Sequence, residues 1–368
     1  MGWNVSIAAC RKTGSGWRLC VALLATLSSP AFAAAESGSN ASGITTLCQP
    51  AASSPSAKQL LMAASRQLGA TSHPLARLHT EGTLPNQGIR EQSIAAEKDW
   101  PVLRRAALAW RLSGDGRYLQ QVDAGLIAWF GTYQPDFNPI DETNLDQLIQ
   151  AYLLTAEQLS PKTREVSRTF LRNLGNGYLA RIAQFHGAKG GTHSNNWQSH
   201  RVKLVTLAAA ALADHEMLGQ AFGVFRQQVA DNLLPDGSVS DFTERDALHY
   251  VVYDLEPLVQ AALAARPYGI GGNWLDYRAA NGASLAHSLD WLMTYASGQR
   301  THQEFVHTTV KFDRDRANVG ETGYSGFWEP KSSSQLYWLA AQLDRRYLPL
   351  ARQLAPNPPD WLGACYLK

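Results

Sequence analysis

Hydrophobic residues recur along most of this chain at the three- and four-residue spacing of one face of an α-helix, whereas the alternation typical of β-strands is scarce. Turn sequences such as Pro235-Asp236-Gly237 separate the periodic stretches, because glycine permits positive φ and aspartate binds the local backbone. The pattern therefore predicts a succession of helical hairpins. The expected helices cover residues 57–68, 99–112, 117–130, 145–159, 162–185, 195–213, 216–233, 245–264, 283–295 and 332–343.

A short internal sequence repeat indicates that the hairpin is repeated. Residues 107–119 read ALAWRLSGDGRYL and residues 338–348 read WLAAQLDRRYL, so each segment joins an apolar helix to an Arg-Tyr-Leu helix start through a polar turn. Stacked hairpins of this kind can close into an incomplete (α/α) toroid, or α/α barrel. We therefore predict an all-α fold of this architecture. An open α-solenoid is the alternative, because repetition alone does not establish closure.

The N-terminus has the three parts of a secretory signal peptide. Basic residues, among them Arg11 and Arg18, precede the apolar run 19–27, and the small-residue motif Ala31-Phe32-Ala33 follows. The run is too short to span a bilayer as a helix, and no later stretch reaches the roughly 20 apolar residues required. We expect cleavage after Ala33 and export to the periplasm or the medium.

The predicted domain organisation follows from this cleavage. Residues 1–33 are the signal peptide, residues 34–56 are a Ser-, Ala- and Gly-rich flexible leader, and residues 57–368 form a single α/α-barrel domain. The mature chain keeps only Cys48 and Cys365, and an oxidising compartment favours a disulfide between them, with two free thiols as the alternative. Two cysteines without a CxxC motif or a histidine cluster do not predict a zinc site.

Composition narrows the class of partner. A net charge of +2 argues against a strongly basic nucleic-acid binder, and a hydrophobic content of 45% argues against a disordered chain. The 11 Trp, 13 Tyr and 11 Phe residues are sufficient to line a carbohydrate groove as well as fill a core. We expect a monomer that binds a polysaccharide and has no membrane-spanning segment after signal cleavage.

Two segments concentrate polar groups on otherwise apolar helices. In the first, residues 193–201 read HSNNWQSHR, so that Asn195 or Asn196 can cap a helix and His200 lies about one turn inside it. This spacing places the amide and imidazole groups together at the N-terminal end of the helix, where they can face one cleft. The structural alternative is an ordinary helix cap beside a hydrogen-bonded core histidine.

The second segment, residues 245–258, reads RDALHYVVYDLEPL. His249 and Tyr253 are four residues apart and share a helix face, and Tyr250 and Asp254 form a neighbouring pair with the same spacing. One tyrosine can then project into a cleft while the other groups anchor the helix. A buried aromatic stripe explains the same spacing without a function.

Together these blocks resemble the alginate-lyase family of secreted uronate-polysaccharide lyases. The matching sequences are NNWQSHR, LLPDG and ALHYVVYDLEPL, and the resemblance extends over about residues 57–350. It implies an α/α toroid in which Asn, His, Arg and Tyr side chains meet the sugar carboxylate and the scissile bond. It also implies that Tyr253 occupies the position of the family's catalytic tyrosine.

The chain departs from the family pattern at two positions. Trp197 follows the Asn pair where the family has histidine, so the resemblance leaves His200 or His193 for that role, and we favour His200. The arginine, Arg245, lies one residue further from the tyrosine than usual. The catalytic residues that the resemblance implies are Tyr253, His200, Asn195, Asn196 and Arg245, and the candidates for substrate binding are Trp197, Arg201, His249, Tyr250, Trp100 and Arg104.

These residue types suit β-elimination. The reaction removes the C5 proton of a 4-linked uronate, stabilises enolate-like charge on the carboxylate and protonates the departing O4. Asn, Arg and a protonated or hydrogen-bonded His200 can stabilise that charge as an oxyanion hole does. Tyr253, as tyrosinate, can serve both proton transfers when C5–H and O4 share a sugar face, as in mannuronate. Guluronate or glucuronate would divide the roles between His200 and Tyr253.

The predicted function is therefore an exported lyase for a 4-linked uronate polymer, with polymannuronate first and a glucuronan-like polymer second. The mechanism requires no metal and no cofactor. A glycoside hydrolase is the enzymatic alternative and would need two flanking carboxylates. A noncatalytic polysaccharide-binding protein is the third possibility, and residues 79–97 have the composition of a mobile lid. The candidate carboxylates of a hydrolase are Asp236, Asp241, Glu244 and Glu97.

Overall fold

The computed structural model describes residues 54–185, 187–188 and 190–365, all of which belong to one unit delimited at residues 40–368. Within these residues the regular secondary structure is helical, and the β-type pairing consists of two isolated bridges. The α-helices are α2 (Pro55–Ser65), α3 (Arg90–Glu97), α4 (Asp99–Ser113), α5 (Gly116–Thr132), α6 (Asp146–Thr155), α7 (Pro161–Gln184), α8 (Asn196–Leu212), α9 (His215–Asn232), α10 (Ser240–Arg245), α11 (Leu248–Ala265), α12 (Leu285–Ala296), α13 (Lys311–Asn318), α14 (Ser334–Leu343), α15 (Leu348–Leu354) and α16 (Asp360–Cys365).

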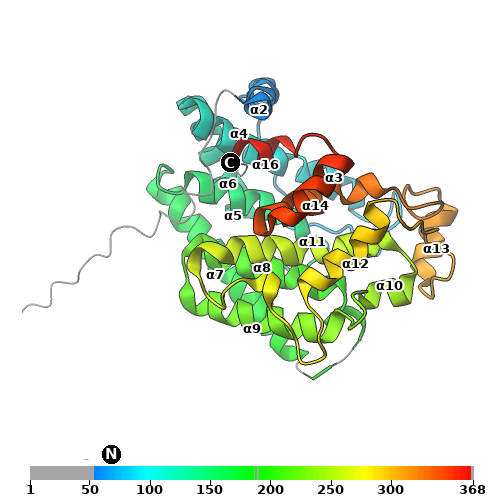
Figure 1. Ribbon diagram of the computed structural model, residues 1–368. Helices are drawn as coiled ribbons and strands as arrows, with labels where there is room; N and C mark the ends of the chain where they lie inside the picture. The colour runs from blue at the N-terminus through cyan, green and yellow to red at the C-terminus, as the bar shows by residue number, and fades with distance from the viewer. Residues whose placement is uncertain (1–53, 186, 189, 366–368) are drawn as a thin grey trace, which may run out of the picture. The chain divides into compact units, whose positions relative to one another are not determined.

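One set of helices packs side by side and forms the inner layer of a ring. α4 packs on α6, α6 on α8, α8 on α11 and α11 on α14, while the C-terminal α16 returns to pack on α2 and α4 (Figure 1). Helices α5, α7, α9 and α12 cover this layer from outside. The predicted all-α fold, an incomplete (α/α) toroid, is confirmed.

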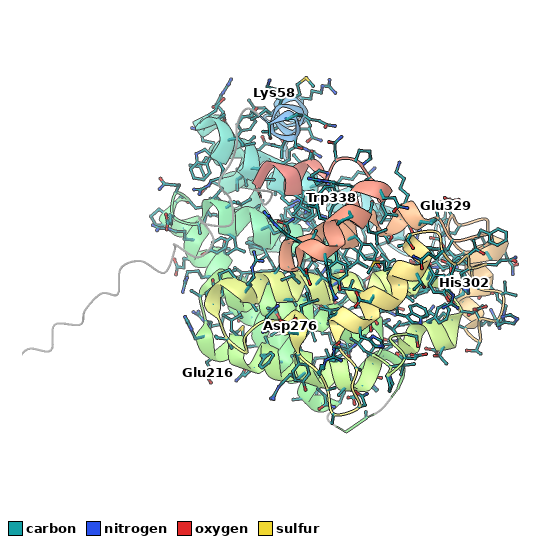
Figure 2. All side chains as sticks on the ribbon, in the orientation of Figure 1. Lys58, Glu216, Asp276, His302, Glu329 and Trp338 are labelled. Atoms are coloured by element: carbon teal, nitrogen blue, oxygen red, sulfur yellow. The ribbon has the colours of Figure 1, made fainter. Side chains whose placement is uncertain are left out.

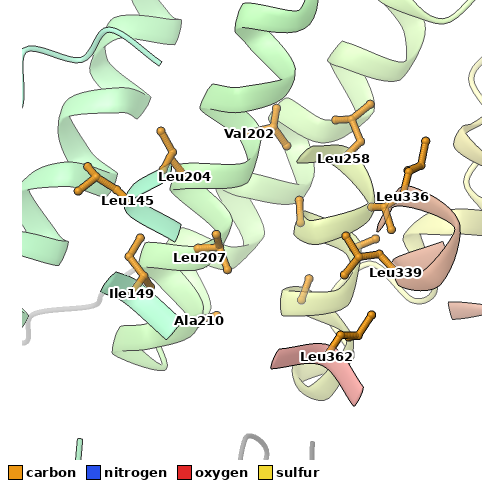
Figure 3. Packing of buried hydrophobic residues seen from close by; sticks show 14 of the residues in the cluster. Leu145, Ile149, Val202, Leu204, Leu207, Ala210, Leu258, Leu336, Leu339 and Leu362 are labelled. Carbon is orange, nitrogen blue, oxygen red and sulfur yellow. The ribbon is translucent and has the colours of Figure 1, made fainter. Parts of the chain in front are cut away.

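Apolar side chains of the ring helices form one continuous core. Leucine, isoleucine and valine side chains of α6, α8, α11 and α14 meet in Figure 3, and Leu207 lies between the helices on either side. Nearly every side chain of α8 is buried, including Arg201 and Lys203. By contrast, Lys58 and Glu216 lie at the outer surface, whereas Trp338 is buried among its neighbours (Figure 2). Charged residues are rarely buried without a partner, so the buried charged side chains of α8 mark a candidate functional region in the interior.

Local signals explain several helix boundaries. Side chains at the first positions accept hydrogen bonds from the helix backbone, as those of Ser160 in α7 and Asn195 in α8 do. The repeated hairpin turn has the same chemistry twice, because Asp115 accepts from Arg117 N and Asp344 accepts from Arg346 N. Gly237 has φ +92°, and a Cβ there would lie 2.8 Å from Trp291 Cβ, so its turn requires glycine.

Three sequence-based predictions need correction. The helix expected over residues 245–264 begins later, at Leu248, because Asp246 adopts a left-handed conformation that separates α11 from the short helix α10 before it. The segment 79–97, expected to be a mobile lid, ends in helix α3. The flexible leader was expected to reach residue 56, but α2 begins at Pro55 with Ser54 as its cap. The signal peptide, the remaining leader and Cys48 lie outside the described residues.

The lid segment is also anchored to the ring. The buried carboxylate of Asp141 accepts hydrogen bonds from the backbone N–H groups of Thr80 and Glu81, at 2.7 and 2.8 Å, and from the Thr80 hydroxyl. His79 Nδ1 lies 3.1 Å from the same carboxylate. These bonds fix the start of the segment against the turn that precedes α6.

A second buried carboxylate fixes that turn from inside. Glu142 is fully buried and accepts from the hydroxyls of Tyr133 and Tyr178 and from Asp136 N. Burial raises the pKa of Glu142 to about 7, against the opposing effect of these donors. The network holds the neighbouring residue Thr143, in the short 3-10 helix η1 (Thr143–Leu145), against α8.

Among the described residues, no helix combines the length and the apolar composition that a membrane span requires.

Candidate active site

A polar cavity of about 330 Å³ lies among the ring helices. Its walls come from α4, the η1–α6 segment, α8, α11, the start of α14 and α16, so that it lies within the ring that these helices form. The lining residues are Arg104, Thr143, Asn144, Asp146, Gln147, His200, Lys203, His249, Val252, Tyr253, Glu256, Pro257, Gln260, Ser332, Gln335 and Trp361. A concave site with convergent polar groups is the usual form of a ligand site.

His200 and Tyr253 come from adjacent helices and meet at the wall of this cavity. Their ring centroids lie 4.3 Å apart at an interplanar angle of 51°. His200 lies one turn into α8 and Tyr253 lies in the second turn of α11, which is the helix most extensively packed on α8. The two side chains are in direct contact, so no sugar ring can fit between them.

A hydrogen-bonded chain orients the His200 imidazole. Lys203 Nζ donates to Thr143 Oγ1 at 2.8 Å and to Thr143 O at 2.7 Å, and Thr143 Oγ1 lies 2.6 Å from His200 Nδ1. When Lys203 donates to the hydroxyl oxygen, the hydroxyl proton is available for Nδ1. That arrangement places the imidazole hydrogen on Nε2, which is buried and makes no hydrogen bond.

His200 is neutral in this environment. Burial and the positive charge of Lys203 lower its pKa well below 6.5, while the backbone of Tyr253 opposes the shift. The alternative of a protonated His200 considered from the sequence therefore conflicts with the structure. A neutral imidazole can still donate one hydrogen bond through Nε2–H.

Tyr253 is half-buried, and burial raises the pKa of its phenol above the ordinary value of 10. The neighbouring Tyr324 adds to this rise, and Arg316 opposes it. The phenol therefore carries its proton at neutral pH in the free protein. The tyrosinate expected from the sequence is a minor form until something in the site lowers this pKa.

Asn196 and Arg245 are brought together by a carboxylate that they share. Asp241 accepts from Asn196 N and Asn196 Nδ2, both at 2.7 Å, and its Oδ1 lies 3.6 Å from Arg245 Nε. Arg245 also donates to Asp313 at 2.5 Å and lies 3.9 Å over the ring of Tyr250. The sequence prediction placed both donors on a substrate carboxylate, but here protein carboxylates occupy them.

The start of α8 is fixed by further buried groups. Asn195 Oδ1 accepts from Trp197 N as the helix cap, and Ser199 Oγ donates to Asp254 at 2.5 Å. Asn232 donates to the other oxygen of Asp254, and Gln228 donates to the carbonyl oxygen of Asn195. This network gives the Asn195-Asn196 pair one orientation.

The remaining predicted binding residues divide into two groups. His249 and Arg104 line the cavity, and burial, with the charges of Arg316 and Arg245, lowers the pKa of His249 to about 4. Trp100 is a wrong prediction, because it is fully buried against Trp129 in the core, with ring centroids 5.2 Å apart. The amphipathic pattern of α4 allowed either face for this ring.

Three more predicted residues lie outside the cavity lining. Arg201 is buried and donates to Thr192 O at 2.6 Å, so that it fixes the loop before α8. Trp197 lies beside the Arg201 guanidinium, and the hydroxyls of Tyr250 and Tyr324 are 3.5 Å apart. These contacts give the side chains structural partners. The ring centroids of His193 and Phe185 lie 4.1 Å apart, and His193 does not line the cavity.

Sequence reasoning missed several residues of the cavity. Thr143, Lys203, Gln147 and Gln260 all line it, but none belongs to a recognisable motif. One signal was available for Lys203, since it follows His200 by three residues and therefore shares its helix face. The contribution of Thr143 depends on a contact across 57 residues of sequence, which no local pattern predicts.

Comparisons with known proteins agree with this architecture. The sequence model of the alginate lyase family matches residues 35–302. The crystal structure of an alginate lyase from Bacteroides ovatus superimposes with a TM-score of 0.61 at 15% identity, covering 87% of this chain and 96% of that chain. A histidine-to-alanine variant of alginate lyase A1-III, complexed with a tetrasaccharide, gives a TM-score of 0.50 at 18% identity, covering 62% and 67%. No curated protein sequence matches significantly.

Proposed function

Because this chain belongs to the alginate lyase family and is a polysaccharide lyase, we propose that it cleaves a 4-linked uronate polymer by β-elimination, with polymannuronate as the preferred substrate. A glucuronan-like polymer is the second candidate. We also propose that the protein acts after export, as the sequence of residues 1–33 predicts. The observation that carries the substrate preference is the contact between His200 and Tyr253.

The contact supports syn elimination. An anti elimination needs an acid and a base on opposite faces of the sugar, but two rings whose centroids lie 4.3 Å apart stand on the same side of any bound substrate. In mannuronate the C5 proton and O4 share one face, so a single tyrosine can serve both steps. This geometry favours mannuronate over guluronate. Contrary to the expectation from the sequence, glucuronate is equally compatible with it, because glucuronate differs from mannuronate only at C2 and has the same arrangement at C4 and C5.

In the proposed reaction the Tyr253 phenolate removes the C5 proton. The electron pair of the C5–H bond forms the C4=C5 double bond as the C4–O4 bond breaks, and the new phenol returns its proton to O4. His200 donates through Nε2–H to the carboxylate, where charge develops. A buried donor without a partner costs free energy, and a substrate oxygen would remove that cost.

Asn195, Asn196 and Arg245 complete the proposed site. The shared carboxylate of Asp241 keeps Asn196 and Arg245 together, and the hydrogen bonds of α8 orient Asn195. We propose that, when substrate binds, the uronate carboxylate takes over donors of Asn196 and Arg245 that Asp241 and Asp313 hold in the free protein. Two of the four candidate carboxylates of a hydrolase are engaged elsewhere, since Asp241 holds Asn196 and Asp236 accepts from Ser238 in a turn.

The test is an ultraviolet absorbance assay on polymannuronate, polyguluronate and glucuronan. Elimination creates a conjugated unsaturated uronate that absorbs, whereas hydrolysis creates no such group. We expect the fastest increase on polymannuronate. Chain shortening without absorbance would indicate a hydrolase, and binding without shortening would indicate a noncatalytic protein.

The raised pKa of Tyr253 predicts an alkaline pH profile. The phenolate is the proposed base, and its fraction in the free enzyme grows as pH rises toward a phenol pKa that burial places above 10. We expect kcat/KM to increase by about tenfold per pH unit on the alkaline side of neutrality, in initial rates on polymannuronate. A flat or falling profile there would exclude the phenolate as the base.

The two remaining cysteines predict a disulfide in the exported protein. Cys48 lies outside the described residues, so the pairing with Cys365 remains a prediction from compartment chemistry. We expect intact-mass analysis to give the mature chain lighter by two hydrogens, and alkylation without reductant to leave that mass unchanged. Incorporation of two alkyl groups would contradict the pairing.

A further inference from the structure

We propose that a groove on the outer helix α7 is a second binding site for the polysaccharide chain, separate from the site at His200 and Tyr253. We call it the α7 groove. One of its walls is α7, and the other is the end of α5 with the segment that follows it, residues 133–137. The groove and the cavity at His200 have no lining residue in common. The proposal rests on the proposed function, because the occupant is the uronate polymer.

The α7 groove has the size and composition of a ligand site. Its volume is about 840 Å³, within the range of about 300 to 1,000 Å³ that such sites occupy. Two of its lining residues, Phe130 and Phe170, are buried and stack with ring centroids 4.5 Å apart, so they form an apolar floor. The rim consists largely of exposed polar side chains, among them Gln134, Thr169 and Asn173. An apolar floor with a polar rim suits the C–H face and the hydroxyl groups of a sugar ring.

Phe137 is held in the groove wall in an unfavourable backbone conformation. Its φ is +63°, which a bulky side chain rarely adopts. The buried carboxylate of Glu142 accepts from its backbone N–H at 3.3 Å. Gly177 of α7 leaves room for the ring, because a Cβ at that position would lie 2.1 Å from Phe137 Cε1. A strained residue that its surroundings maintain points to a functional constraint on this wall.

A row of basic side chains lies beside the groove. Lys162 lines the groove itself. Exposed arginines follow along α7 at four-residue spacing, and they are Arg164, Arg168 and Arg172. Within the described part of the chain these arginines form no ion pair. Two of them directly precede the groove-lining residues Thr169 and Asn173, so the row runs parallel to the groove.

The charge of α7 identifies an anionic polymer as the occupant. The helix carries five basic residues and one carboxylate, Glu165, although the net charge of the whole chain is only +2. Arginine guanidinium groups bind carboxylates with two parallel hydrogen bonds. Residues four apart in a helix lie about 6 Å apart along its axis, which is close to the length of one sugar residue in a 4-linked chain. A polyuronate has one carboxylate on each such residue, whereas a second copy of this basic surface would be repelled.

The first experiment measures polymer binding without turnover. Arg168→Gln/Arg172→Gln and its control are made in the Tyr253→Phe background, in which the polymer is expected to persist. Affinity electrophoresis in native gels that contain polymannuronate gives the dissociation constant. We expect about fivefold weaker binding, as for the loss of two exposed ion pairs. The matched control, Arg345→Gln/Arg352→Gln, makes the same charge change at exposed arginines outside α7 and should bind as the background protein does.

A second pair of variants tests the shape of the groove without changing its charge. Gly177→Ala adds a Cβ where the Phe137 ring lies, so the ring must move and the wall must change. Gly219→Ala is the matched control, because it adds the same methyl group within helix α9 with no neighbouring atom within 4 Å. We expect a loss of retardation by polymannuronate in Gly177→Ala and none in Gly219→Ala, with melting curves as the check on folding.

Kinetics on substrates of two lengths, in the protein with Tyr253 intact, give an independent measurement. Trimannuronate is too short to occupy the site at Tyr253 and the α7 groove together, so the arginine variant should cleave it at the wild-type rate. On polymannuronate we expect KM to increase about fivefold with kcat unchanged. An equal loss of kcat/KM on both substrates would mean that the arginines support the catalytic site, and it would overturn the groove.

The outcomes separate the groove from the proposed function. Unchanged retardation in the arginine variant, or an equal loss in its control, overturns the groove and leaves the proposed function intact if the polymer is cleaved. Retardation that depends on Arg168 and Arg172 without any cleavage removes the proposed function and leaves the groove. Light scattering that shows a wild-type dimer and a monomer for Gly177→Ala would make this face a subunit interface, which also overturns the groove.

Discussion

Tyr253→Phe is expected to lower turnover on polymannuronate by about 10² to 10⁴ while leaving the fold intact. The substitution removes the phenolic proton carrier and keeps the ring that packs 4.3 Å from His200. Because the hydroxyl serves both proton transfers in the proposed syn elimination, its removal takes away the base and the acid together. Initial rates by ultraviolet absorbance measure the effect, and circular dichroism with a melting curve checks the fold.

Tyr295→Phe is the matched control for this experiment. Tyr295 is a buried core residue of α12 that does not line the cavity. We expect its removal of a hydroxyl to leave turnover near wild type. Turnover near wild type in a folded Tyr253→Phe protein would contradict the assignment and redirect attention to Tyr250, whose hydroxyl lies beside that of Tyr324.

His200→Ala is expected to lower kcat by about 10² to 10³, whereas His193→Ala should change it far less. His200 lines the cavity, contacts Tyr253 and has an unpartnered Nε2, so its loss removes a donor from the developing charge. His193 packs on Phe185 outside the cavity lining. The measurement is kcat and KM for both variants on the best uronate polymer.

His200→Gln separates chemistry from packing. Its amide keeps an N–H donor and most of the side-chain volume, so it should recover part of the rate that His200→Ala loses. A structural role alone would give similar melting losses and similar rates for both variants. A larger rate loss in His193→Ala would reverse the two histidine assignments, and small equal losses would leave the carboxylate to Asn195, Asn196 and Arg245.

The helices of this protein could largely be predicted from its sequence, because helix formation depends on signals a few residues apart. The apolar periodicity and the capping side chains of Ser160 and Asn195 lie within their own segments. The short helices α3 and α13 were missed, since their sequences are strongly polar and carry no continuous apolar face. Such helices are stabilised by the surfaces on which they dock.

The break between α10 and α11 shows what lies beyond local signals. Asp246 has φ +52°, and its carboxylate accepts from His307 N at 2.8 Å, while its carbonyl accepts from Phe305 N. These partners are about 60 residues away in the chain. They compensate the cost of a left-handed backbone conformation at Asp246, and they move the start of the expected helix from residue 245 to Leu248.

The sequence by itself predicted the helical toroid and the family, and it singled out His200 and Tyr253 as candidates, because these predictions depend on apolar periodicity and on contiguous motifs. The contact between His200 and Tyr253 joins two helices and comes from the tertiary structure. Only the tertiary structure decided their protonation, since desolvation depends on every group packed around a side chain. It also decided that Asp241 holds Asn196 and that Thr143 meets His200, because these pairs join segments 45 and 57 residues apart. Long-range packing, which no local pattern encodes, brings these residues together in the candidate site.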